Sequence, residues 1–339
     1  MAKAFVTGCA GAELTADERA FLGAERPWGL ILFARNVETD RQLRRLVEEF
    51  RRAVDDEGAP VLIDQEGGRV QRLRAPLAPN YPSNATLGRL PRNEAERAVW
   101  LLSRLHAFDL ARFGIDIDCL PVADVPAMGA HAVIGDRAYS GDPAEVERLA
   151  HAACEGLLAG GVLPVIKHMP GHGRANADSH KALPVVSASR EALEERDFRP
   201  FMSLSGMPVG MTAHVVFEAL DPTAPATLSP IVIETIIRGT FGFDGLLLSD
   251  DISMHALDGT FEERTRRLLD AGCDIALHCN GVFEEMAAVA SASPALEGTA
   301  LARAERALTL RMHRDEASEG ELRIEFERLT GANVARPAA

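Results

Sequence analysis

The chain runs from Gly161-Val-Leu-Pro-Val-Ile166 directly into Lys167-His-Met-Pro-Gly-His-Gly-Arg-Ala-Asn-Ala-Asp-Ser-His180. The first part is a short apolar run, typical of a strand that is buried on both faces. The second part holds a lysine, three histidines and an aspartate, with glycines that let the backbone bend and a ligand come close. A core strand that ends in such a polar segment is the unit from which we infer both the fold and the site.

Similar apolar runs recur along the whole chain. They lie at 29–33, 60–64, 115–122, 162–166, 208–215, 245–248 and 274–278, with 4–7 as a weaker eighth run. Helical patterns lie between or after them at 94–113, 142–160, 189–204, 229–240, 262–271 and 300–314. Asp142-Pro143 is a good helix start and Gly160-Gly161 a good stop. Alternating strands and helices predict a parallel sheet, and about eight strands favour a single-domain α/β fold, the (β/α)8 TIM-type barrel, over an open doubly wound sheet.

The domain organisation follows from the absence of any repeat, low-complexity tract or linker in the sequence. We predict one catalytic barrel over residues 1–331 and a frayed C-terminal tail over 332–339. The proline-rich stretch 76–84 is interpreted as a loop at the barrel mouth rather than a domain boundary.

Composition limits the classes of function. The 339 residues carry a formal net charge of −14, which argues against nucleic acid or an anionic membrane surface as a partner. The N-terminus lacks the apolar stretch of a signal peptide, and no run is long enough to span a bilayer. The five cysteines are scattered and form no Cys-x-x-Cys pair. We therefore expect reduced cysteines, no zinc site and a cytoplasmic location.

Polar residues stand where nearly every apolar run ends. Because the active sites of such barrels lie at the carboxyl ends of the strands, these residues should form one site. In chain order they are Arg35-Asn36, Asp64 with the segment 65–69, Asp124, Lys167-His168, His214, Ser249-Asp250-Asp251 and Asn280-Gly281.

The second dense motif covers residues 63–72. Asp64 leaves a core strand, and its carboxylate can accept two hydroxyl hydrogen bonds, as sugar recognition requires. Gly67-Gly68 permits close backbone approach, and Arg72 offers a fork of donors. The alternative is an ordinary ion pair at the end of a strand.

The third motif is the pair Asp250-Asp251. A carboxylate at the end of an apolar strand is suited to attack an electrophilic carbon. Adjacent side chains on extended backbone point in opposite directions, so we expect only one of the two, Asp250, in the site. The alternative for each is an N-cap of the next helix, and this alternative is stronger for Asp251.

The segment after Lys167-His168 predicts proton transfer. Histidine titrates near neutral pH, and Asp178 can orient the imidazole of His180 two residues later. The alternative is an ordinary polar loop. A zinc cluster of His168, His172, His180 and Asp178 is a further alternative, but Lys167 would be an unfavourable cationic neighbour, and we expect no metal.

Together these segments resemble the bacterial β-N-acetylglucosaminidases (β-hexosaminidases) of glycoside hydrolase family 3, the single-domain enzymes of peptidoglycan recycling. The segments that carry the resemblance are 30–33 with Arg35-Asn36, 63–72, 120–125, 134–140, 166–180, 211–214 and 249–254. They cover the chain to about residue 280, and Lys-His-x-Pro-Gly-His-Gly followed by Asp-Ser-His is highly specific. Met169 departs from the family's usual phenylalanine, and the part after Asn280 matches weakly.

The resemblance implies a role for each matching residue. Asp250 is similar to the catalytic nucleophile, His180 to the general acid/base and Asp178 to its orienting partner. The residues similar to those that hold N-acetylglucosamine are Asp64, Arg72, Arg137, Lys167 and His168. The implied activity is a retaining exo-β-N-acetylglucosaminidase that acts on muropeptides linked to 1,6-anhydro-N-acetylmuramic acid, without a cofactor. The expected partner is this small-molecule substrate, and the expected state is a monomer.

Three other functions stay open at this point. One is a β-glucosidase of the same family. Another is a Schiff-base lyase that uses Lys167 at its strand end. The last is a catalytically silent sugar-binding barrel, which would need Asp64 and Arg72 but has no use for Asp250 together with Asp178 and His180.

Overall fold

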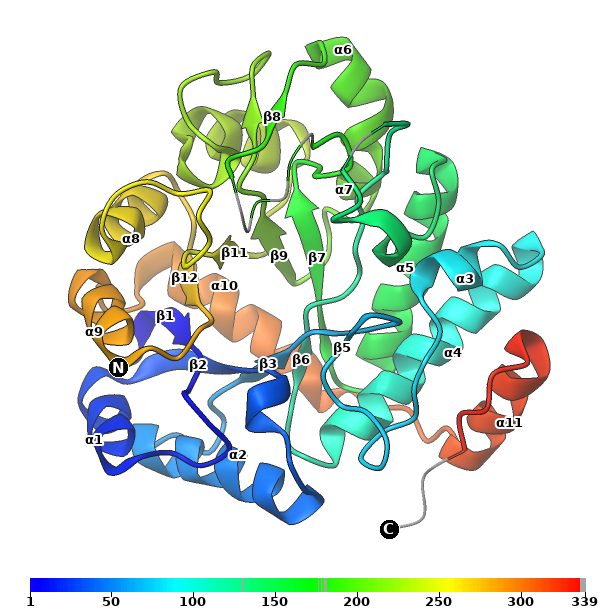
Figure 1. Ribbon diagram of the computed structural model, residues 1–339, viewed down its shortest axis with the longest axis horizontal. Helices are drawn as coiled ribbons and strands as arrows, with labels where there is room; N and C mark the ends of the chain where they lie inside the picture. Colours follow the sequence, from blue (N-terminus) through cyan, green and yellow to red (C-terminus); the bar gives the residue numbers. More distant parts are fainter. Residues whose placement is uncertain (130, 176, 178, 180–181, 336–339) are drawn as a thin grey trace.

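A closed parallel barrel forms the centre of the molecule. In the computed structural model, which describes residues 1–129, 131–175, 177, 179 and 182–335, the strands follow the order β1-β12-β11-β9-β7-β6-β3-β2 around the barrel. Figure 1 shows this ring of strands with the helices packed around it. The predicted (β/α)8 TIM-type barrel is confirmed.

The strands of the barrel are short, and several of the connections between them are long. The barrel strands are β1 (Lys3–Thr7), β2 (Pro27–Leu32), β3 (Val61–Ile63), β6 (Ile117–Asp118), β7 (Leu163–Met169), β9 (Val209–Thr212), β11 (Leu246–Asp251) and β12 (Ile275–His278). Two small sheets lie outside the barrel: β4 (Gln65–Gly67) pairs with β5 (Val70–Gln71), and β8 (Val185–Val186) pairs with β10 (Val216–Phe217).

Helices connect and cover the strands. They are α1 (Ala16–Glu25), α2 (Asp40–Val54), α3 (Asn84–Gly88), α4 (Arg92–Ala111), α5 (Pro143–Ala159), α6 (Arg190–Ala192), α7 (Arg199–Ser203), α8 (Phe261–Asp270), α9 (Phe283–Ala292), α10 (Gly298–Thr309) and α11 (Glu319–Thr330). Shorter or wider helical segments are η1 (Ala34–Asn36), η2 (Gly135–Arg137), η3 (Leu193–Asp197), η4 (Ala226–Leu228), η5 (Ile231–Thr240) and η6 (Leu310–Met312).

The apolar runs form strands because both of their faces are buried. Successive side chains of a strand point to opposite faces. In β11, Leu246 and Leu248 belong to the core inside the barrel, whereas Leu247 packs in the layer between the strands and the helices. The two cores explain why these runs are apolar throughout rather than alternating.

All eight predicted strands are present, including the weaker one at 4–7. Their ends differ in two places that matter for the site. Lys167 and His168 lie within β7 rather than after it, and Asp250 and Asp251 form the end of β11. The ladder is irregular at both places, but it resumes at Met169 and at Asp251, and Lys167 also bridges Val122.

The helices agree less completely with the prediction. α5 has Asp142 as its N-cap and ends at Gly160, as expected. The predicted helix 189–204 is instead a series of three segments, α6, η3 and α7, which begins after the N-cap Ser189. The helix expected at 300–314 ends earlier, at Thr309. The prediction omitted α1, α2, α3, α9 and α11.

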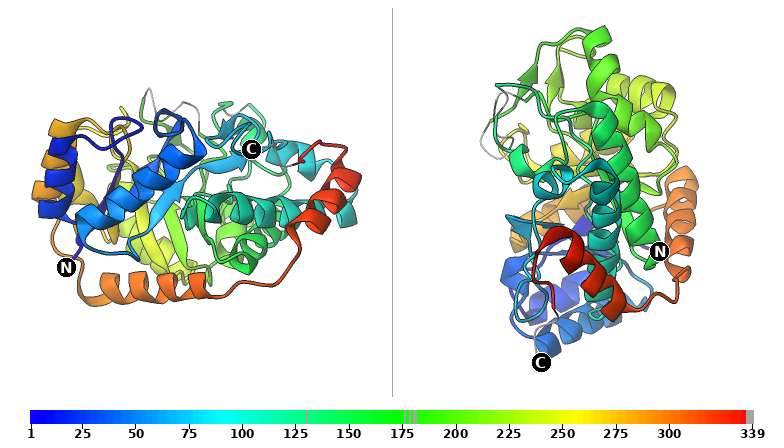
Figure 2. Two further views of the ribbon diagram at one scale, coloured as in Figure 1. Left: turned by 90° about the horizontal axis from the view of Figure 1, so that it is seen from below. Right: turned by 90° about the vertical axis from the view of Figure 1, so that its right-hand side faces the viewer.

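α10 closes one end of the barrel, and α11 lies on the outside of the helical layer (Figure 2). α10 packs Ala304 and Ala307 against the core inside the barrel, at the end where the strands begin. α11 lies against α4. Nη2 of Arg323 on α11 donates to Oδ1 of Asp109 on α4 at 2.7 Å. Within residues 332–335, Val334 is buried and its carbonyl accepts from Arg323. The tail boundary near residue 332 stays a prediction.

No helix in the described ranges combines the length and apolar character needed to cross a membrane.

Candidate active site

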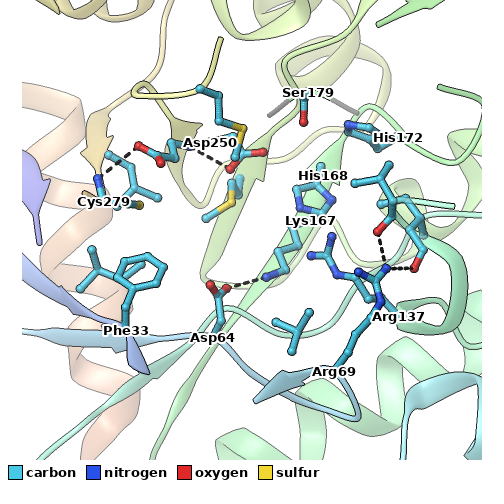
Figure 3. A pocket seen from close by; sticks show the side chains of 18 of the residues that line it. Phe33, Asp64, Arg69, Arg137, Lys167, His168, His172, Ser179, Asp250 and Cys279 are labelled. Atoms are coloured by element: carbon cyan, nitrogen blue, oxygen red, sulfur yellow. Dashed lines mark hydrogen bonds and ion pairs between the residues drawn. The ribbon is translucent and has the colours of Figure 1, made fainter. Parts of the chain in front are cut away.

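A pocket of about 530 Å³ opens at the carboxyl ends of the barrel strands. Such a volume is typical of a small-ligand site. Figure 3 shows Arg69, Arg137 and Lys167 on one side of the pocket and Phe33 and Asp250 on the other. Its other lining residues include Asp64, Arg72, His131, Val133, Ile134, His168, His172, Ser179, Met211, Asp251, Met254 and Cys279.

A chain of alternating charges forms the floor of the pocket. Nζ of Lys167 lies 2.9 Å from Oδ1 of Asp64 and 2.7 Å from Oε1 of Glu66. Glu66 also accepts two hydrogen bonds from Arg137, both at 2.9 Å, and Asp64 accepts one from Arg72 at 2.8 Å. The side chains of Lys167 and Glu66 are only 2% and 1% exposed. Each buried charge is therefore compensated by opposite charges rather than by water.

These pairings set the protonation states. Burial alone would lower the pKa of Lys167, but the carboxylates of Asp64 and Glu66 outweigh burial and raise it well above the ordinary value. Burial likewise opposes ionisation of Asp64, yet the charges of Lys167 and Arg72 hold the pKa of Asp64 far below its usual range. The lysine is thus a permanent cation, and Asp64 can only accept hydrogen bonds from a ligand.

A second buried group centres on Asp124. Oδ2 of Asp124 lies 2.7 Å from Nδ1 of His168, and Oδ1 accepts the backbone N–H of His172 at 2.6 Å. The first contact fixes the orientation of the His168 ring. Burial and the neighbouring His168 lower the pKa of His172 to about 4. His172 is therefore neutral at pH 7, and its ring packs edge-to-face against His168 at 5.7 Å.

Asp250 is held at the end of β11 by its own backbone neighbour. Its Oδ1 accepts the N–H of Asp251 at 2.8 Å. Burial opposes ionisation of Asp250, but the charges of His168 and His214 and the hydrogen bond from Asp251 outweigh it, so its pKa is lowered. Asp250 is therefore an ionised carboxylate within the pocket.

Asp251 has a structural environment. Its side chain accepts hydrogen bonds from Ser253 and from the backbone N–H of Cys279, and its carbonyl accepts from Nε2 of His214 at 3.0 Å. Both aspartates border the pocket, and the expectation that only the carboxylate of Asp250 serves the site stays a prediction. The carboxylate of Asp251 is already engaged.

Most of the residues predicted for the site come together in this pocket. They are Asp64, Arg72, Arg137, Lys167, His168 and Asp250. Asp178 and His180 lie outside the described residues. Ser179, which stands between them in the sequence, is buried and lines the pocket.

Three further residues hold the site together, and the sequence grouped them with the strand ends without assigning them a role. Glu66 joins Lys167 to Arg137, Asp124 orients His168, and His214 supports the turn after Asp250. Each stands at or next to a predicted strand end, which was the available signal. Their partners come from distant parts of the chain, so no local pattern distinguishes a supporting residue from one that contacts a ligand.

Within the described ranges, no group of three or more His, Cys, Asp or Glu residues has the arrangement needed for a metal ion. Of the four residues considered for zinc, His168 is already bound to Asp124, and Asp178 and His180 are not described.

Comparison of the sequence with known proteins gives a consistent result. Residues 8–310 match the family described as the glycosyl hydrolase family 3 N-terminal domain. A protein of Idiomarina loihiensis named beta-hexosaminidase is 39% identical over 305 residues, which cover 88% of this chain and 90% of that protein.

Two solved structures have closely similar folds. NagZ of Neisseria gonorrhoeae, solved with N-trifluoroacetyl-D-glucosamine, has a TM-score of 0.86 and 31% identity, and the match covers 98% of both chains. A glycoside hydrolase family 3 beta-N-acetylglucosaminidase from Paenibacillus sp. str. FPU-7 also has a TM-score of 0.86, with 29% identity over 96% of this chain and 66% of that longer one.

Proposed function

The chain belongs to glycoside hydrolase family 3, and from this membership we propose that it is a retaining exo-β-N-acetylglucosaminidase of peptidoglycan fragments. Its relatives named beta-hexosaminidase support hydrolysis of β-linked N-acetylhexosamine. The observation that carries the proposal is the shared pocket: an ionised Asp250 faces the hydrogen-bonding groups of Asp64, Arg72, Lys167 and His168. This combination suits a sugar whose anomeric carbon lies over a carboxylate.

The sugar-binding part of the mechanism rests on fixed charges. Asp64 accepts hydrogen bonds from sugar hydroxyls, and Arg72, Lys167 and His168 donate to sugar oxygens. Because Lys167 and Arg72 already hold Asp64 in place, these groups need little reorganisation when the substrate binds. Arg137 is held in place by Glu66, whose two carboxylate oxygens accept hydrogen bonds from its guanidinium.

The chemical part uses two displacements. Asp250 attacks the anomeric carbon and forms a covalent glycosyl-enzyme while the bond to the departing oxygen breaks. His180, oriented by Asp178, donates its proton to that oxygen. It then removes a proton from the water that hydrolyses the intermediate, so the configuration is retained. Ser179, which stands between these two residues in the sequence, lines the pocket and supports the proposal.

The physiological substrate is proposed from the resemblance of the sequence to the peptidoglycan-recycling enzymes. It is a muropeptide with terminal, non-reducing N-acetylglucosamine on 1,6-anhydro-N-acetylmuramic acid. All five cysteines are buried and free, which supports a reducing compartment and hence the cytoplasm. We propose a monomer, and size-exclusion chromatography with light scattering measures that directly.

The first experiment is release of 4-nitrophenol from its β-N-acetylglucosaminide at neutral pH, with a chelator present. Wild-type protein should release it rapidly, and Asp250→Ala should lose activity by about three orders of magnitude or more, as expected when a nucleophile that acts with an acid is removed. Asp270→Ala, on the exposed end of α8, is the matched control and should keep full activity.

The other outcomes point to the alternatives. No release by folded wild-type protein would contradict the proposal, and activity on the β-glucoside instead would support the β-glucosidase. Full activity of Asp250→Ala would mean that another group is the nucleophile. Loss of wild-type activity on adding the chelator would mean that a metal takes part. Retention is tested separately by NMR of the anomer that is released first.

A further inference from the structure

We propose that Arg69 is a positioning residue, which fixes the pocket-lining segment 131–137 and, through it, the segment 172–175 that leads in sequence to Asp178 and His180. This inference rests on the proposed role of His180 as the general acid/base. It assigns to Arg69 an effect on proton transfer rather than on sugar binding.

The contacts of Arg69 are concentrated on one short stretch of chain. Its Nε donates to Oδ1 of Asp136 at 2.7 Å. Its Nη2 faces three successive carbonyl oxygens, at 3.3 Å for Ala132, 2.6 Å for Val133 and 3.2 Å for Ile134. Although Arg69 lines the pocket, these donors are already engaged by the protein. The side chain therefore acts as a clamp on the segment.

Arg69 itself projects from a rigid turn. Gly67 and Gly68 have φ values of 91° and 58°, which favour glycine, and a Cβ on Gly67 would lie 2.4 Å from the carbonyl oxygen of Pro82. The N–H of Gly68 donates to the carbonyl of Tyr81 at 2.9 Å. The guanidinium is thus held from a fixed base, which a clamp requires.

The clamped segment is joined to the second one by a backbone hydrogen bond, in which the N–H of His131 donates to the carbonyl of Ala175 at 2.9 Å. Just before the clamped segment, the N–H of Ala127 donates to the carbonyl of Gly173, also at 2.9 Å. The backbones at Gly173 and Val125 approach so closely that a Cβ on Gly173 would lie 2.1 Å from the carbonyl oxygen of Val125. A shift of residues 131–134 therefore changes the support of residues 173–175.

The clamp is small in its contribution to stability. The side chains of Arg69 and Asp136 are 48% and 47% exposed, and an exposed ion pair contributes at most about 1 kcal/mol. Replacing Arg69 should therefore leave the barrel folded while it loosens the two segments. This separation between stability and activity makes the proposal testable.

The experiment compares two aryl β-N-acetylglucosaminides that differ in their need for a proton donor. The 2,4-dinitrophenolate group departs without protonation, whereas phenolate needs the general acid. For Arg69→Met, we expect kcat/KM on the phenyl substrate to fall about tenfold more than on the dinitrophenyl substrate, a part of the 10²–10⁴-fold that acid catalysis supplies. Asp136→Asn should show the same trend more weakly, because it keeps the carbonyl contacts. Arg41→Met, exposed on α2, is the matched control.

Each outcome has a definite meaning. Equal losses on both substrates, with a raised KM, would overturn the proposal and make Arg69 a binding residue, and unchanged kinetics would overturn it as well. His180→Gln is the reference for loss of the acid: if it shows no preference for the dinitrophenyl substrate, the proposed role of His180 fails instead. Thermal unfolding of every variant separates these results from misfolding, and Asp136→Asn supplies the test if Arg69→Met does not fold.

Discussion

Nδ1 of His168 lies 2.7 Å from Oδ2 of Asp124, and Asp124 is fully buried. Burial opposes ionisation of Asp124, but the charge of His168 and its hydrogen bond outweigh this effect and lower the pKa of Asp124. The contact therefore fixes the His168 ring at the edge of the pocket, with an ionised carboxylate beside it. Among the charges that lower the pKa of Asp250, that of His168 is the largest. The protonation of the proposed nucleophile is thus linked to a contact on a different strand.

The first prediction concerns the acid limb of the pH profile. As the proposed nucleophile, Asp250 must be ionised to attack, and its lowered pKa favours the ionised form. In His168→Gln the favourable charge is lost, so the pKa of Asp250 should rise. As the pH is lowered, the variant should therefore lose activity at a higher pH than the wild type does. We therefore expect the acid limb of kcat/KM to move to higher pH in the variant. The measurement is kcat/KM from pH 3 to 8 on the 4-nitrophenyl substrate, and a limb that stays in place would contradict this linkage.

The second prediction concerns the buried charges below the pocket. Asp64 and Glu66 have pKa values below the ordinary range because burial is outweighed by Lys167 together with Arg72 and Arg137. A carboxyl group whose pKa is lowered by folding stabilises the protein at pH values above its pKa in the unfolded chain. This stabilisation is lost as the pH falls through the pKa of the folded state. The free energy of unfolding should therefore fall as the pH drops below about 4.

The same buried charges predict the effect of Lys167→Met. Removal of the cation leaves Asp64 and Glu66 with one arginine each, and breaking a buried pair costs about 3–5 kcal/mol. Urea unfolding at pH 7 measures the loss. Lys3→Met is the matched control, because the contact of Lys3 with Glu25 is about one-third exposed and should contribute less than about 1 kcal/mol. Equal losses in the two variants would argue against a stabilising role for the buried group.

The third prediction separates the hydrolase from the Schiff-base lyase. An amine attacks a carbonyl only in its neutral form, and the carboxylates of Asp64 and Glu66 hold Lys167 in its charged form. Borohydride reduction in the presence of a sugar aldehyde should therefore give no adduct at Lys167 by mass spectrometry. A reduced adduct that disappears in Lys167→Met would favour the lyase.

The fourth prediction concerns His214, which lies behind the proposed nucleophile. Its Nε2 donates to the carbonyl of Asp251, and its Nδ1 lies 2.8 Å from Oγ1 of Thr227. His214→Leu frees the turn that aims the N–H of Asp251 at Asp250. A displacement of about 1 Å can cost about 100-fold in rate, so kcat should fall by about 10- to 100-fold while KM changes little. Thr227→Val should have a smaller effect, and the exposed His313→Leu should have none. A change in KM alone would mean that His214 affects substrate binding instead.

The sequence was sufficient for the barrel because each strand is an apolar run that ends in a polar residue. It was also sufficient to group Asp64, Lys167 and Asp250, since the carboxyl ends of parallel strands meet at one face of a barrel. It was insufficient where the relevant contact joins segments far apart in the chain. The contact of Arg69 with residues 132–136 depends on how two loops pack, and no local pattern encodes it.

Other omissions had local signals that the sequence prediction did not use. Thr39 and Gln42 form a capping box at the start of α2, and the apolar positions of that helix recur with helical spacing. α11 likewise starts at the N-cap Ser318 and ends at Gly331 in the left-handed conformation. For α11, however, no local signal shows why this mostly polar helix stays attached to the barrel.

The last prediction concerns that attachment. Arg323 of α11 is only 7% exposed and donates to Asp109 of α4 at 2.7 Å and to the hydroxyl of Tyr81 at 3.0 Å. Arg323→Leu leaves Asp109 buried without its cation, which should lower the free energy of unfolding by about 3–5 kcal/mol. Arg97→Leu is the matched control on the same two helices, because its contact with Glu325 is about one-third exposed and should contribute less than about 1 kcal/mol. Neither α4 nor α11 contributes a residue to the lining of the pocket. The kcat and KM of the folded Arg323→Leu protein should therefore be unchanged. A loss of kcat at a temperature where the variant is fully folded would instead mean that α11 supports the site.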